Sequence, residues 1–197
     1  MLLVRRTAAV VGAAVALAAL SGGCSGNSNP RTATPGTSAA SSAGTPNSAQ
    51  PIDYTKLLIK PTDIEAPMTF TATPPVVNPN GQPGAAVTFS GPENSRVITD
   101  TVLVFPDSTA AAGALDAAKT ALGNSVKGTP KPEDVGTGGT KVEGNSPDNS
   151  KGKTVLLFTE GRAFVTIDFD APPELFPPPE FVTQLGQKQA AAIKNGL

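Results

Sequence analysis

TVLLFTEGRAFVTIDF, residues 154–169, is the stretch that decides the fold. Two runs rich in β-branched and aromatic residues, 154–158 and 163–169, flank the turn signal Glu160-Gly161. Such runs are typical of β-strands, and the short interval between them predicts a tight antiparallel hairpin. Because a hairpin joins neighbouring strands without a crossover helix, it favours an antiparallel sheet over a parallel one.

Further strands are predicted on the N-terminal side of this hairpin. Residues 86–90 (AVTFS) form a short strand that stops at Gly91-Pro92. Residues 96–105 (RVITDTVLVF) form a longer strand, since β-branched residues dominate it. Residues 140–143 add a short strand inside a loop-rich segment.

Two helices are predicted, one on each side of the hairpin in sequence. The first covers residues 108–126, where Asp107 or Ser108 can cap the N-terminus. The second covers residues 180–197. Each carries a narrow apolar stripe at intervals of three and four residues. The stripes are Ala111, Leu115, Ala118, Leu122 and Val126 in the first helix, and Val182, Leu185, Ala192 and Ile193 in the second.

The order of these elements is strands, helix, strands, helix. It predicts one α+β domain over residues 52–197, with an antiparallel β-sheet of about 4–6 strands and two helices packed on one side. We expect this domain to follow a signal peptide and a disordered linker.

The first 23 residues have the layout of a secretory signal peptide. Arg5 and Arg6 supply the positive charge, residues 7–20 are an apolar run, and residues 21–23 are small. The apolar run is too short for a mature transmembrane helix, which takes ~20 residues. An uncleaved N-terminal anchor stays as an alternative.

Cys24 is the only cysteine of the chain and directly follows the small residues. The segment LAALSGGC, residues 17–24, resembles a bacterial lipobox, although Ser21 stands where that motif usually has Leu. The resemblance implies that a lipid is attached to the Cys24 thiol and that the signal is cut just before it. The chain would then be anchored to the extracytoplasmic face of the cell membrane. An ordinary secretory signal is the alternative.

Residues 24–51 are expected to hold the lipidated cysteine and a disordered tether. From residue 25 to 51 the chain is built mainly from Ser, Gly, Thr, Ala, Pro and Asn, with Arg31 as its only charge. Without Val, Ile, Leu or aromatic residues, the segment cannot offset the entropy of ordering. A flexible chain of this length has an r.m.s. reach of ~30 Å, and its Ser/Thr/Pro content permits O-glycosylation.

The composition excludes several function classes. The formal net charge is −1, and loss of Arg5 and Arg6 with the signal leaves 13 basic against 16 acidic residues, or −3. That balance gives no basis for nucleic-acid binding. With no histidine, the chain lacks the usual general base and the commonest zinc ligand, so we expect no metal, no cofactor and no enzyme activity.

Three patterns suggest catalysis or ligand binding, and a structural explanation suffices for each. Ser150 and Lys153 fit a Ser-x-x-Lys pattern, but they lie in a loop before a strand rather than at the start of a helix. Residues 136–139 (GTGG) match no phosphate-binding fingerprint. Clustered carboxylates can bind Ca²⁺, yet the cluster at a strand end matches no calcium-loop spacing and indicates a charged sheet edge. It consists of Asp168, Asp170 and Glu174.

Residues 172–181 (PPELFPPPEF) are the most distinctive surface candidate. Proline runs prefer an extended conformation that partners can dock onto at low entropic cost. Leu175, Phe176 and Phe181 are unusual in a loop, and two interpretations stay open. They either pin the crossing segment onto the core or contact a partner.

The lipobox, the Ala-rich signal, the Ser/Thr/Pro tether and the single small domain resemble the cell-envelope lipoproteins of mycobacteria and related actinobacteria. Within these, the order of elements after Ile52 is similar to LpqN/LpqT-type lipoproteins and, more distantly, to the extracellular sensor domain of PknH-type kinases. Those sensor domains carry disulfides, whereas this domain has none. No catalytic or binding residue is carried over.

This resemblance implies a non-enzymatic, membrane-anchored lipoprotein that acts as an interaction or ligand-sensing module. Its partners would be the membrane, through the lipid on Cys24, and an envelope protein or lipid. The first alternative is a carrier of lipid or glycolipid, which needs an apolar cavity of several hundred Å³. The second is a hydrolase, which would have to work without histidine.

Overall fold

The computed structural model describes residues 52–197 of the chain. The predictions for the signal peptide, the lipobox cysteine Cys24 and the tether fall on residues 1–51 and therefore lie outside the described residues. Between residues 52 and 197, no helix is long and apolar enough to cross a membrane.

Eight strands form one antiparallel sheet in the described part of the chain. Their order across the sheet is β1-β3-β4-β8-β7-β6-β5, with β2 also pairing with β3. The bounds are β1 Thr71–Ala72, β2 Val76–Val77, β3 Gly84–Ser90, β4 Val97–Val104, β5 Lys131–Pro132, β6 Thr137–Asn145, β7 Gly152–Glu160 and β8 Ala163–Ala171. The α+β class with an antiparallel sheet is thus confirmed.

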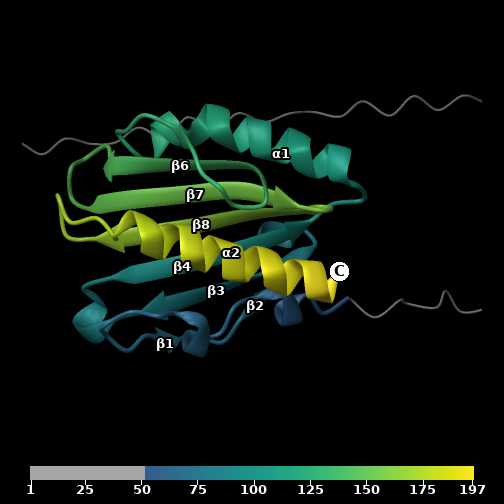
Figure 1. Cartoon of the computed structure of the whole chain (residues 1–197), viewed down its shortest axis with the longest axis horizontal. Helices are drawn as coiled ribbons and strands as arrows, with labels where there is room; N and C mark the ends of the chain where they lie inside the picture. The colour runs from purple at the N-terminus through teal and green to yellow at the C-terminus, as the bar shows by residue number, and fades with distance from the viewer. Residues whose placement is uncertain (1–51) are drawn as a thin grey trace, which may run out of the picture. The chain divides into compact units, whose positions relative to one another are not determined.

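The predicted hairpin is the centre of the sheet (Figure 1). β7 and β8 pair along their whole length from Gly152↔Ala171 to Glu160↔Ala163. Gly161 makes the turn at a φ of 57°, a conformation that glycine adopts without steric cost. β8 then pairs with β4, so the meander β6-β7-β8 joins the earlier hairpin β3-β4 into one continuous sheet.

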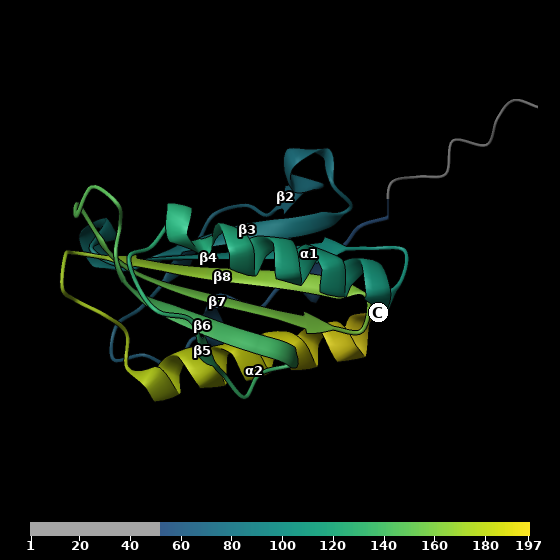
Figure 2. The same ribbon diagram turned by 90° about the horizontal axis from the view of Figure 1, so that it is seen from above.

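The helices α1, Ser108–Ala121, and α2, Pro179–Gly196, cover opposite faces of the sheet (Figure 2). The expectation of two helices on one side is wrong in this respect, and the strands outnumber the expected 4–6. The physical reason lies in β7, where every second side chain faces α2 and the others face α1. Leu156 and Phe158 belong to the core beneath α2, whereas Val155 and Leu157 belong to the core beneath α1.

Both helices form where the apolar stripes predicted them, but α1 ends at Ala121 and does not extend to Val126 as predicted. Asp107 caps α1, since its carboxylate accepts a hydrogen bond from the backbone N–H of Ala110 at 2.8 Å. Leu115 of α1 is buried against β7 and β8. In α2, the buried side includes the predicted residues Val182, Leu185 and Ile193.

Candidate functional site

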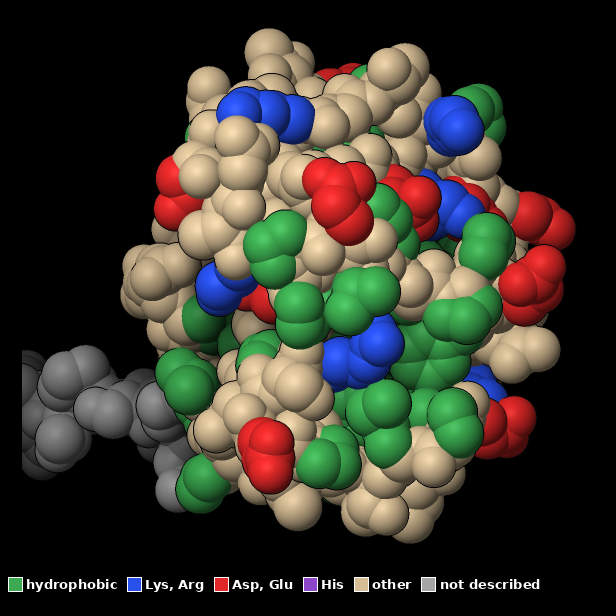
Figure 3. All heavy atoms as spheres, turned by 90° about the vertical axis from the view of Figure 1, so that its left-hand side faces the viewer, with side chains coloured by type: hydrophobic (Ala, Val, Ile, Leu, Met, Phe, Trp, Pro, Cys, Tyr) green, Lys and Arg blue, Asp and Glu red, His purple; other side chains and the backbone are tan. Residues whose placement is uncertain are grey.

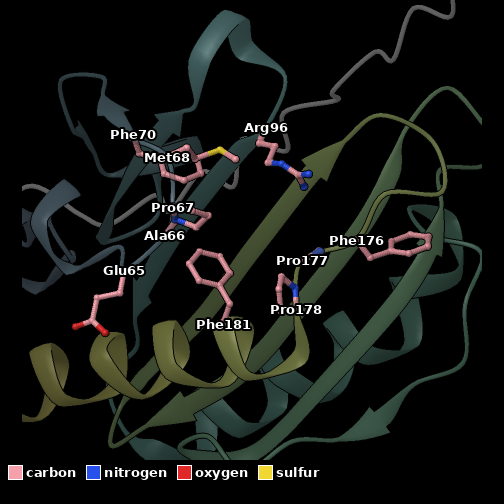
Figure 4. Close-up of a pocket in the computed structure, with 10 residues that line it drawn as sticks. All are labelled: Glu65, Ala66, Pro67, Met68, Phe70, Arg96, Phe176, Pro177, Pro178 and Phe181. Atoms are coloured by element: carbon pink, nitrogen blue, oxygen red, sulfur yellow. The ribbon is translucent and has the colours of Figure 1, made fainter.

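An apolar groove with a volume of about 380 Å³ lies at one end of the sheet. Three segments that are far apart in sequence form it: residues between Glu65 and Phe70, Arg96 just before β4, and the stretch from Phe176 to Phe181 (Figure 4). This volume falls within the range of about 300–1,000 Å³ that small-molecule sites occupy. We refer to this feature as the apolar groove.

Aromatic packing builds the inner wall of the apolar groove. Phe181, in the first turn of α2, points toward the segment that carries Pro67 and Met68 (Figure 4). Its ring meets that of Phe169 on β8 edge to face, with centroids 6.0 Å apart and an interplanar angle of 70°. Phe70 is buried on the opposite side. These side chains are fixed by the core behind them, so the wall does not depend on a ligand for its shape.

Two polar side chains of α2 hold the N-terminal wall in place. Lys188 donates to the backbone carbonyl of Asp63 at 2.8 Å and to a carboxylate oxygen of Glu65 at 2.7 Å. Gln189 is fully buried; its amide oxygen accepts the N–H of Ile59 at 3.0 Å and its amide nitrogen donates to the carbonyl of Leu57 at 2.7 Å. The segment before β1 is therefore clamped to α2 by four hydrogen bonds.

The proline-rich crossing packs closely against the start of β7. A Cβ at Gly152 would come within 2.6 Å of the Leu175 carbonyl oxygen, so only glycine permits this approach. Asn145 at the end of β6 hydrogen-bonds the side chain and the backbone N–H of Glu174. The path of the crossing is thus set by its close approach to Gly152 and by the hydrogen bonds of the Asn145 side chain.

The charged side chains around the apolar groove differ in whether they have an ion-pair partner. Glu65 forms an ion pair with Lys188 at 2.7 Å. Arg96 is half-buried, and no carboxylate of the described residues lies within 4.0 Å of its guanidinium. The apolar groove therefore has one cation without an anionic partner.

A smaller hollow continues from the apolar groove toward the end of β8. It shares Phe70, Arg96 and Phe181 with the groove and adds Asp170. Figure 3 shows this end of the molecule, where hydrophobic side chains gather with basic side chains among them.

The three crossing residues that the sequence singled out lie in different environments in the structure. Phe181 and Phe176 both line the apolar groove and are half-buried, and the ring of Phe176 points away from Phe181 (Figure 4). Leu175 is 47% exposed and is not part of the lining, so the interpretation of Leu175 as a core anchor is wrong.

Sequence reasoning missed Met68, Phe70 and Arg96. Met68 and Phe70 alternate with Thr69, which is a weak strand signal, but they precede only the two-residue strand β1. Arg96 was assigned to the start of a strand, and nothing in its neighbourhood along the chain indicated a groove. Only the folded chain brings these residues to Phe176 and Phe181.

The other candidate patterns have structural explanations in the described residues. Ser150 donates to Asp148 at 2.8 Å, whereas Lys153 pairs with Asp168 at 2.9 Å and Asp170 at 3.0 Å. Although partial burial raises it, hydrogen bonds from Lys151 and Lys153 hold the pKa of Asp170 below its ordinary value. Among the residues described, no three acidic, Cys or His side chains gather in a way that would hold a metal ion.

One titratable group lies in the core away from the apolar groove. Asp100 of β4 has no exposed surface, and neither carboxyl oxygen has a hydrogen-bond partner among the protein atoms described. Burial raises the pKa of Asp100 to about 8. The nearby N–H of Ile59 opposes the shift, but its hydrogen bond goes to Gln189. Burial therefore favours the protonated, neutral form of the Asp100 carboxyl group.

No family model matches this chain, and no curated protein matches it. Among solved structures, the chain is similar to the crystal structure of the extracellular domain of PknH from Mycobacterium tuberculosis, with a TM-score of 0.52 and 10% sequence identity. The match covers 74% of this chain and 97% of that domain. Likeness at this identity shows a shared fold, so the resemblance to PknH-type domains holds for the fold. The resemblance to envelope lipoproteins stays a prediction.

Proposed function

We propose that this chain is a non-enzymatic, exported module that is held at the extracytoplasmic face of the membrane by a lipid on Cys24 and binds a small ligand in the apolar groove. The observation that carries the binding role is the groove itself, a hollow of about 380 Å³ with apolar walls assembled from three remote segments. Apolar pockets of this size are the usual sites for small ligands.

The fold and the charges support this function over hydrolysis. The fold is similar to that of the extracellular domain of PknH, which supports the proposal of an exported module. Ser150 and Lys153 are engaged with different partners, and Asp168 and Asp170 both pair with Lys153. The carrier alternative uses the same groove; a carrier would extract its ligand from vesicles and release it to others, whereas a sensor would retain it.

The binding role is tested with N-phenyl-1-naphthylamine, a neutral apolar dye whose fluorescence rises in apolar sites. The protein is residues 25–197, since every residue of both hydrophobic cores described lies between Tyr54 and Ile193. We expect saturable binding, and we expect Ala66→Phe to weaken it at least about tenfold because the added ring overfills the groove.

Ala72→Phe is the matched control, since Ala72 is exposed on β1 and does not line the groove. It should leave dye binding unchanged, and both variants should keep a cooperative thermal transition. Equal dye affinity in the unsubstituted chain and in Ala66→Phe, or no saturable binding at all, would show that the groove is not a binding site.

The proposed lipid anchor is tested separately by expressing the full chain in a bacterial host and separating the membrane and soluble fractions. Cys24→Ala removes the thiol that the lipobox resemblance predicts to be lipidated, so the variant should lose the lipid and leave the membrane fraction or accumulate uncleaved. A Cys24→Ala protein that still carries lipid would contradict the proposed anchor.

A further inference from the structure

We infer that the ligand of the apolar groove is an amphiphile with one alkyl chain and one anionic head, and that Arg96 binds the head. This inference rests on the proposed function and names its ligand class. The apolar walls receive the chain, and the guanidinium receives a carboxylate or phosphate.

The charge distribution around the groove carries the inference. Three charged side chains line the groove and the hollow that adjoins it: Glu65, Arg96 and Asp170. The two acids are neutralised, Glu65 by Lys188 at 2.7 Å and Asp170 by Lys151 and Lys153 at 2.8 and 3.0 Å. Of these three side chains, only Arg96 has no ion-pair partner among the described residues. An anionic ligand therefore meets one available cation and no unpaired anion.

The backbone places Arg96 directly against the apolar wall. The N–H of Gly91 donates to the Arg96 carbonyl at 2.8 Å, which closes the turn between β3 and β4. A Cβ added to Gly91 would lie 3.4 Å from the Met68 sulfur and 3.6 Å from the Phe70 ring. The turn that carries Arg96 therefore lies beside Met68 and Phe70, with room at Gly91 for no more than ordinary van der Waals contact.

The chemistry of guanidinium selects the head group. Arginine presents planar, paired N–H donors that match a carboxylate or phosphate, and it is less strongly hydrated than lysine. A purely apolar ligand would cover this half-buried cation without giving it a partner, at a desolvation cost. An anionic head removes that cost.

A single tryptophan provides the readout, because the chain has none of its own. Phe181→Trp places the indole in the groove, and Leu175→Trp places it on the exposed crossing outside the lining. The titrants are decanoate, decanol and decyltrimethylammonium, which share one alkyl chain and differ in head charge. Displacement of N-phenyl-1-naphthylamine from the unsubstituted chain gives a second readout that needs no substitution in the groove.

We expect decanoate to shift the tryptophan emission of Phe181→Trp and to bind with the highest affinity, decanol to bind more weakly and decyltrimethylammonium to bind most weakly. Leu175→Trp should show no saturable shift in emission. Arg96→Gln should lower the affinity for decanoate about tenfold or more and leave the affinity for decanol unchanged. Lys194→Gln, the same charge change at the far end of α2, should have no effect. From octanoate to dodecanoate, affinity should rise about fourfold for each methylene.

The outcomes separate this inference from the proposed function. Equal binding of decanoate and decanol, or an Arg96→Gln variant that binds decanoate normally, overturns the anionic head while leaving an apolar site in place. Binding to vesicles of phosphatidylglycerol without binding of decanoate overturns the single-chain ligand in favour of a membrane surface. Failure of the dye and of every titrant overturns both.

Discussion

Asp100 and Gln189 are fully buried polar side chains that face the same core beneath α2, and their hydrogen bonding differs. Gln189 satisfies both ends of its amide with backbone groups of the segment before β1. Asp100 has no partner for either oxygen in the described structure. A buried carboxylate without partners is costly, and the carboxyl group responds by holding its proton.

This raised pKa predicts a pH-dependent stability. Unfolded, Asp100 ionises near its ordinary pKa of 3.8; folded, it stays protonated up to about pH 8. The folded state therefore binds one more proton between these values, and stability should fall as pH rises through that window. We expect the free energy of unfolding to drop by about 1 kcal/mol per unit between pH 5 and 7 relative to Asp100→Asn, measured by urea denaturation.

The control is Asp116→Asn, since Asp116 is exposed on α1. This variant should keep the pH dependence of the unsubstituted chain. A flat profile for the unsubstituted chain, or an Asp100→Asn variant with the same slope, would contradict a buried neutral carboxyl group.

Burial also predicts how much stability is lost when an apolar side chain in the core or on the crossing is truncated. Phe158 is fully buried, Phe176 is half-buried and Leu175 is 47% exposed. Substitution by Ala should cost about 3–5 kcal/mol at Phe158, less at Phe176, and below about 0.5 kcal/mol at Leu175. Thermal unfolding measures the series. A Leu175→Ala variant as damaged as Phe158→Ala would restore Leu175 as a core anchor.

At the scale of elements, the central hairpin was predictable and the arrangement of helices was not. Strands β7 and β8 carry long β-branched runs, so local sequence determined both their existence and their turn. Residues 155–158 are a continuous apolar run rather than an alternating one, which is typical of a strand buried on both faces. The run does not tell which helix covers which face, and the prediction of both helices on one side was therefore wrong. The strands β1, β2 and β5 have two residues each, too few for any periodicity.

The clamp between α2 and the segment before β1 gives a prediction at this scale. Gln189→Ala leaves the Ile59 N–H and the Leu57 carbonyl buried without partners, which should cost about 2–4 kcal/mol. The Ile59 amide should lose protection in hydrogen exchange. Gln187→Ala is the matched change on the same helix, where one exposed bond to the Asp134 carbonyl at 3.2 Å is lost. Equal effects of the two variants would show that the clamp does not hold the segment.

At the scale of the whole molecule, the apolar groove is a product of topology. Its walls come from the segment before β1, from the residue before β4 and from the crossing into α2. The sequence marked Phe176 and Phe181 because aromatics beside proline runs stand out locally. No local sequence pattern pointed to Arg96. Its proposed role depends on the ion pairs that Glu65 and Asp170 form with lysines from other parts of the chain.

The domain boundary is testable by deletion. Residues 25–51 contain no Val, Ile, Leu or aromatic residue, and both cores described begin at Tyr54 or later. Deletion of residues 25–51 should therefore change the free energy of unfolding by less than about 0.5 kcal/mol, measured by urea denaturation of chains beginning at residues 25 and 52. Loss of cooperative unfolding in the shorter chain would place part of the fold in the tether.

The most direct measurement of the central claim, that the apolar groove holds a ligand, is native mass spectrometry of residues 25–197, which lack Cys24, exported by the protein's own host behind a cleavable signal and purified without detergent. We expect the unsubstituted chain to carry an additional mass, and the released molecule to be an acidic single-chain amphiphile. Ala66→Phe should be recovered without this molecule, whereas Ala72→Phe should retain it. A bare unsubstituted chain, or the same bound mass on the Ala66→Phe variant, would contradict it.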